Sequence, residues 1–280
     1  MDTASSGRFG GTLVRRLLGL ALLVVAALAL FAVACGDDGD GGDGGDGDED
    51  ASAIEQTIRD LAAAWNAKDV DGALAVVTDN FLATELEGAT REEAPDILSE
   101  FIGEEPFTIT EISEVEVSGD TATALVKGSE GNLVSLDRDS FVKEGEEWKL
   151  DGEEDLAPEI PEGTTAVDLT LTEYKFTFDE ATITSGNIAF NVSDIGGEQH
   201  VVDLSKIPED LDIEQALQSE EEPPGIERVG NIEPLDPGGE STMVFTEPLG
   251  PGRYVMICWV EAADGEPHFA KGMWAEFTIE

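Results

Sequence analysis

The sequence contains little positive charge. Lysine and arginine together number 15, against 62 aspartates and glutamates, and the formal net charge is −47. A polyanion this strong repels the phosphates of nucleic acids and anionic lipid headgroups, so nucleic-acid binding is set aside. The same charge permits electrostatic steering of a basic protein partner, although solubility or adaptation to a salty medium explains the charge more readily.

Cysteine and histidine are also scarce, with two residues of each. Cys35 ends an apolar leader and Cys258 lies in a distant segment, so no disulfide is expected between them. In an exported chain, Cys258 is therefore an unpaired thiol in an oxidising compartment, which requires an explanation. The two histidines are His200 and His268.

Residues 1–35 are typical of an export signal. Arg8, Arg15 and Arg16 precede an uncharged apolar run, which ends in Ala-Val-Ala-Cys with Cys35 last. This ending resembles the bacterial lipobox, and the resemblance implies that Cys35 is lipidated. An uncleaved signal anchor is the alternative, because the run is just long enough to span a bilayer. Both interpretations place the remaining chain on the extracytoplasmic side of the membrane.

Two segments are expected to be linkers. Residues 36–50 contain only glycine and acidic residues, which predicts a disordered, solvated tether. One calcium-repeat hexad fits Gly41 to Asp46, but a single copy favours the linker. Residues 156–165, with acids and prolines, predict a linker between two domains.

Residues 51–155 predict an α+β domain. Ser52 and Glu55 fit a capping box that starts a helix, and its apolar stripe ends at Trp65. A short helix over 70–77 and a capped one after Thr90 follow. Beyond residue 106 the apolar period becomes two, which predicts an antiparallel meander with helices on one face.

This domain resembles the NTF2-like, or SnoaL-like, cone fold. The resemblance is carried by Ala-Trp-Asn-Ala-Lys-Asp at 64–69, Val-Ser-Gly-Asp-Thr-Ala at 117–122 and the closing hairpin at 141–150. Enzymes of this fold commonly use a pocket histidine and aspartate, but residues 51–155 contain no histidine. A non-catalytic module that binds a small molecule or a partner is therefore expected. The candidate pocket acids are Asp69, Asp71 and Asp79, while Trp65 and Trp148 are more typical of a core.

Residues 166–280 predict an all-β sandwich, because many short apolar segments alternate with glycine- and proline-rich turns. Residues 207–228 differ, and predict an acidic surface insertion with a short helix. The expected strands are 167–171, 174–178, 183–192, 200–204, 229–232, 242–245, 254–260 and 274–279.

Four residues of this domain form a candidate metal site. Cys258 lies in the apolar strand 254–260, a loop leads to His268, and Met273 precedes the last strand. His200, at the start of another strand, is the fourth candidate ligand. Two imidazoles, a thiolate and a thioether are the ligands of a mononuclear type 1 copper site. A two-copper centre is excluded, because it needs a second cysteine in this loop.

The domain resembles the cupredoxin, or plastocyanin-like, family, whose fold is a Greek-key sandwich. Matching pieces are Glu-Tyr-Lys-Phe at 173–176, the segment 183–193 that leads to His200, and Gly-Arg-Tyr at 252–254. His268 and Met273 have the His-x4-Met spacing of plastocyanins. Nine residues separate Cys258 from His268, where small plastocyanins have only a few. A cupredoxin-like domain without metal is the alternative.

Together these features predict a membrane-tethered, extracytoplasmic blue-copper electron-transfer protein that is not an enzyme and has a basic redox partner. The alternative is a binding or scaffold lipoprotein, in which the first domain holds a ligand and the second is structural or stores copper. An isomerase- or cyclase-like enzyme in the first domain is a third possibility, which the missing histidine disfavours.

Overall fold

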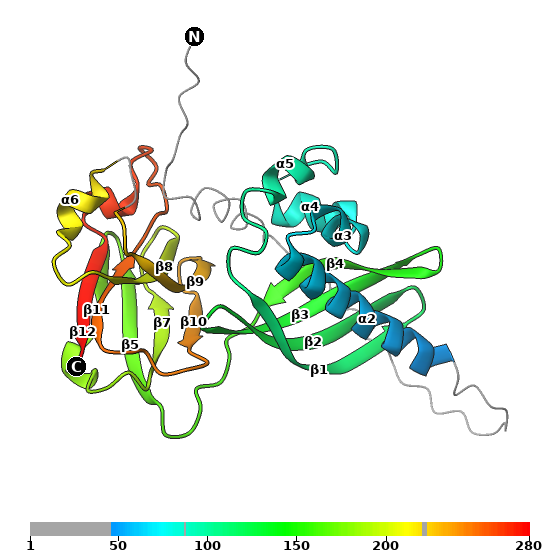
Figure 1. Ribbon diagram of the computed structural model, residues 1–280, viewed down its shortest axis with the longest axis horizontal. Coiled ribbons are helices and arrows are strands. Elements are labelled where there is room, and N and C mark those ends of the chain that lie inside the picture. Colours follow the sequence, from blue (N-terminus) through cyan, green and yellow to red (C-terminus); the bar gives the residue numbers. More distant parts are fainter. Residues whose placement is uncertain (1–45, 87, 220–222) are drawn as a thin grey trace, which may run out of the picture.

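The computed structural model describes residues 46–86, 88–219 and 223–280. The predicted leader, the lipidation site Cys35 and residues 36–45 of the predicted tether lie outside the described residues. The described chain is mostly β-sheet with few helices (Figure 1). None of its helices is long and apolar enough to cross a membrane.

The first sheet is an antiparallel meander of strands β1-β2-β3-β4. Its strands alternate in burial: Ala122, Ala124 and Val126 are buried on β2, while the residues between them are more exposed. α2 crosses one face of the sheet, and the three short helices α3, α4 and α5 lie near the C-terminal end of α2 (Figure 1). The bounds are α2 Asp46–Ala67, α3 Val70–Ala75, α4 Asp79–Glu85, α5 Ala94–Leu98, β1 Phe107–Ser118, β2 Thr121–Glu130, β3 Leu133–Glu144 and β4 Glu147–Asp155.

The predicted start of the first helix was wrong. α2 begins at Asp46, so the last five residues of the predicted tether are helical, and Ser52 lies inside the helix with its Oγ donating to the carbonyl of Asp48. Asp50 anchors this extension, because it accepts hydrogen bonds from Lys143 Nζ at 2.6 Å and Trp148 Nε1 at 2.9 Å. Acidic residues are also favoured in the first turns of a helix.

The second half of the chain contains two four-stranded sheets, in the orders β10-β7-β5-β6 and β12-β11-β8-β9. β5 and β7 run parallel and the other pairs antiparallel. The facing side chains of the two sheets form one buried apolar cluster, which includes Phe190, Met256 and Phe277. The bounds are β5 Thr165–Thr172, β6 Lys175–Thr177, η1 Glu180–Thr182, β7 Ile188–Asp194, β8 His200–Ile207, α6 Ile213–Leu217, β9 Glu227–Leu235, β10 Glu240–Val244, β11 Gly252–Ile257, η2 His268–Lys271 and β12 Trp274–Ile279.

The segment predicted as an acidic surface insertion contains the expected short helix and is mostly exposed or half-buried, but its buried apolar residues cover part of a sheet. Ile213 and Ala216 of α6 are buried against Val255 and Ile257, on the outer face of the sheet that contains β11. This cover explains why β11 is apolar on both faces rather than alternating.

The two halves of the chain touch where β3 meets β9 and β10. Leu133 at the start of β3 forms an isolated bridge with Phe245, and the side chain of Asn132 is hydrogen-bonded to Thr246 and Glu247. This contact places β9 beside the end of the first sheet at which β3 begins (Figure 1).

Candidate functional site

The four predicted metal ligands lie together at one end of the two facing sheets. His200, Cys258, His268 and Met273 are each 0% exposed. Cys258 Sγ is 3.5 Å from His268 Nδ1, and the ring centroids of the two histidines are 5.0 Å apart. Met273 belongs to the same buried apolar cluster as Cys258. The rings of His200 and His268, 68 residues apart in the chain, are therefore neighbours in space.

Backbone hydrogen bonds hold three of these residues in place. β11 ends at Ile257, one residue before Cys258, rather than running to Val260 as predicted. The Cys258 N–H then donates to the carbonyl of Met273 at 3.1 Å, and the Met273 N–H donates to the carbonyl of His268 at 2.9 Å. The His268 N–H also donates to the carbonyl of Val260 at 2.8 Å, so the loop between Cys258 and His268 is closed on itself, despite its length.

A carboxylate oxygen lies close to one ring nitrogen of each imidazole. Asp194 Oδ2 lies 2.9 Å from His200 Nδ1, and both side chains are buried. Glu198 Oε2 lies 3.1 Å from His268 Nε2, an ion-pair distance without good hydrogen-bond angles. Contact with the Asp194 carboxylate keeps a proton on His200 Nδ1, which leaves Nε2 as the ring nitrogen that can bind a metal ion. Carboxylates behind metal-binding histidines orient the ring in this way.

Burial sets the electrostatics of the site. It raises the pKa of the Cys258 thiol to about 11, although the Val201 N–H donates to Sγ at 3.5 Å. Burial and the nearby His200 both lower the pKa of His268. The group therefore holds a neutral thiol and a neutral imidazole at pH 7, and a cation that binds between them would displace the thiol proton.

The donor atoms fit copper by type. Among histidine, cysteine, aspartate and glutamate in the described ranges, no three are in position to hold a metal ion as they stand. The set nonetheless contains the soft sulfurs and imidazoles that copper prefers. His200 Nε2 is buried without a hydrogen-bond partner in the described part of the chain. This imidazole nitrogen is therefore available as a ligand to a metal ion.

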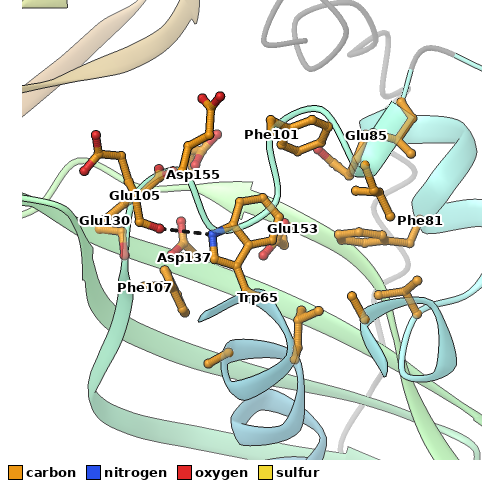
Figure 2. A pocket seen from close by; sticks show the side chains of 18 of the residues that line it. Trp65, Phe81, Glu85, Phe101, Glu105, Phe107, Glu130, Asp137, Glu153 and Asp155 are labelled. Carbon is orange, nitrogen blue, oxygen red and sulfur yellow. Dashed lines mark hydrogen bonds between the residues drawn. The ribbon is translucent and has the colours of Figure 1, made fainter. Parts of the chain in front are cut away.

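A second feature is a cavity of about 260 Å³ between the helices and the β1–β4 sheet. Trp65, Phe81 and Phe101 contribute apolar walls, and Trp65 Nε1 donates to the carbonyl of Glu105 at 3.2 Å (Figure 2). Asp137, Glu153 and Asp155 contribute carboxylates to the wall of the same cavity (Figure 2). Arg228 and Glu233 of β9 complete the wall, so both halves of the chain form the cavity.

Like charges face one another across β3 and β4. Asp137 is paired with Asp155 in the strand register, and Asp139 with Glu153. Burial raises the pKa of Asp137 to about 8 and that of Asp139 to about 7. Glu153 is accessible to solvent beside the cavity, yet surrounding protein and the other carboxylates raise its pKa well above the usual range. Burial similarly raises the pKa of Glu85 to about 7.

The acids proposed from the sequence are not those of the cavity. Asp69 caps α3 by accepting from the Gly72 N–H at 3.0 Å, Asp71 lies in the first turn of that helix, and Asp79 is paired with Arg91. None of the three is part of the cavity wall.

Of the tryptophans, Trp148 is a core residue, as expected, whereas Trp65 lines the cavity. Trp259 packs edge-on against Phe269, and Trp274 is partly buried in the cluster with α6.

Comparisons with known proteins give fold likenesses only. No family model and no curated protein sequence matches the chain. Among solved structures, auracyanin from Roseiflexus castenholzii is 24% identical, with a TM-score of 0.29, over 42% of this chain and 98% of that one. An NTF2-like protein of unknown function from Pseudomonas putida is 18% identical, with a TM-score of 0.32, over 40% of this chain and 88% of that one.

A second NTF2-like protein of unknown function, from Shewanella baltica, is 12% identical over 39% of this chain and 96% of its own length, with a TM-score of 0.31. The neighbours thus include cupredoxin and NTF2-like folds, each covering about two fifths of the chain. TM-scores this low carry no information on function.

Proposed function

We propose that the group formed by His200, Cys258, His268 and Met273 binds one copper ion as a type 1 site and that the protein transfers single electrons. The observation that carries this proposal is the convergence of four fully buried side chains with this donor set. Bound copper would supply reversible one-electron chemistry between Cu(II) and Cu(I). No substrate is transformed, so the protein is not an enzyme.

The surrounding residues fit this task. Cys258, the two histidines and Met273 would hold the ion, with the Met273 thioether binding more weakly than the thiolate and the imidazoles. Asp194 and Glu198 would orient the imidazoles, and the Val201 N–H would stabilise negative charge on the sulfur. The apolar cluster around Cys258 and Met273 excludes water. A buried site fixed by backbone hydrogen bonds rearranges little when its charge changes, which favours fast electron transfer.

The sequence supports a place and a partner for this activity. The leader that ends at Cys35 supports a lipid anchor, with the described domains on the extracytoplasmic side of the membrane. The net charge of −47 supports a basic redox protein as partner. Docking of this kind weakens as ionic strength rises, so the rate of electron exchange with a basic protein is expected to fall with added salt.

The test is copper loading of the exported protein. We expect one Cu(II) per chain to remain after desalting, with intense absorption near the red end of the visible spectrum. Cys258→Ser should abolish the colour. Met273→Leu should shift the reduction potential, whereas Met256→Leu, at an equally buried methionine of the same core, should leave it unchanged. A wild-type protein that stays colourless and retains no copper would refute the proposal.

A further inference from the structure

The wall of the cavity beside Trp65 contains many more acidic than basic residues. Its lining includes eight acidic residues and a single basic one, Arg228. That guanidinium has partners of its own, since it donates to Asn231 Oδ1 at 2.8 Å and lies 3.8 Å from Asp203. The rest of the wall is largely apolar and aromatic. An apolar space with several carboxylates at one side is complementary to a molecule with an apolar body and a positive charge.

Next to this wall, outside the cavity itself, lies a carboxyl oxygen without a donor. Asp139 is 5% exposed, and its Oδ1 has no hydrogen-bond partner among the described residues. It faces a small void of about 20 Å³, whose walls include Asp137 and Glu153 of the larger cavity. Such a void has room for about one water molecule. A buried carboxyl without a donor, opposite two groups that can carry the same charge, costs stability, and a cation bound nearby would offset part of that cost.

The aromatic residues restrict the kind of cation. Trp65 and Phe101 are in edge contact, with ring centroids 5.6 Å apart, and both line the cavity with Phe81. Aromatic faces attract ammonium groups, and their apolar surface stabilises an attached hydrocarbon. The cavity, at about 260 Å³, is more than ten times the volume of the small void, which leaves room for a small arylalkylamine.

We propose that this cavity binds a small organic cation, an amine with an apolar or aromatic body, whose ammonium group is held by Asp137 and Glu153 while its body packs against Trp65, Phe81 and Phe101. The copper site lies elsewhere in the chain, and the two proposals stand independently. Because β9 contributes Arg228 and Glu233 to the wall, the bound molecule would also contact the second half of the chain.

The experiment is calorimetric titration of the full chain at pH 8 and low salt with 2-phenylethylammonium. The probes for comparison are its neutral analogue 2-phenylethanol, the anion 3-phenylpropionate, and calcium ions alone. We expect the ammonium to bind at least about tenfold more tightly than the alcohol, as a charge-assisted hydrogen bond predicts, and the anion not to bind. Equal affinities for ammonium and alcohol would overturn the proposal, as would binding of calcium without binding of the amine.

Two variants locate the site. Asp137→Asn and Glu153→Gln should each weaken binding of the ammonium by about tenfold, with little effect on the alcohol. Glu154→Gln is the matched control, because Glu154 is exposed and adjacent to Glu153 but is not part of the cavity wall. Both cavity variants remove like-charge repulsion, so they should fold, as circular dichroism would verify. Unchanged ammonium affinity in both folded variants would refute the assignment.

Discussion

Replacing Asp139 by asparagine should stabilise the protein at alkaline pH. Burial raises the pKa of this carboxyl from its usual 3.8 to about 7. The difference corresponds to roughly 4 kcal/mol of destabilisation when the group is ionised, at about 1.4 kcal/mol per pH unit. The new amide also brings unpaired donors, at a cost of about 1–3 kcal/mol. The net gain expected for Asp139→Asn at pH 8 is therefore about 1–3 kcal/mol.

The pH dependence identifies the cause. A carboxyl with a raised folded-state pKa contributes no penalty below its unfolded pKa; the penalty grows as pH rises from about 4 and is complete above about 7. Urea unfolding followed by far-ultraviolet circular dichroism at pH 4.5, 6 and 8 should show an advantage of the variant that increases with pH. Glu154→Gln, on the exposed face of β4, should show none. A variant whose advantage is the same at all three pH values would refute the electrostatic reasoning.

Three further changes test the second half of the chain. Asp194→Asn weakens the orientation of His200 and should lower copper affinity about 10- to 100-fold in a competition assay, with the fold unchanged; an unaltered affinity would contradict its role. Gly186→Ala would place a Cβ 1.7 Å from the carbonyl oxygen of Leu249, so we expect a clearly lower thermal midpoint, and a wild-type midpoint would show that this loop can move. Phe277→Ala removes a ring that is 1% exposed and should cost about 3–5 kcal/mol in urea unfolding; a loss below 1 kcal/mol would mean that the core closes around the space.

The candidate metal ligands could be identified from the sequence because their chemistry is rare in this chain. With two histidines and one cysteine outside the leader, few other ligand sets were available. The carboxylates behind the imidazoles were missed, since 62 acidic residues give no reason to select Asp194 or Glu198. Only the contacts that the end of β7 makes with His200, and the loop before β8 with His268, distinguish them.

The acidic cavity illustrates a different limit. Asp137 and Asp139 have the same two-residue phase as the buried Phe141, so the sequence contained a signal that they point inward. The residues of β4 that pair with these two aspartates, Asp155 and Glu153, gave no such signal in the sequence. Register shifts at this point, because Ser140 pairs with Gly152 and Phe141 with Leu150, which leaves Asp151 as an extra residue. This bulge changes the phase and turns Glu153 toward Asp139.

The amino-acid sequence by itself determined the order of elements, the apolar cores and the kinds of donor atom available for a metal, because period, turn residues and composition are local properties of the chain. Tertiary structure decided which acids face one another, which carboxylates orient the histidines, and that β9 closes a cavity formed mainly by the first half. These depend on strand register and on contacts between distant segments, where a shift of one residue moves a side chain to the opposite face of a sheet.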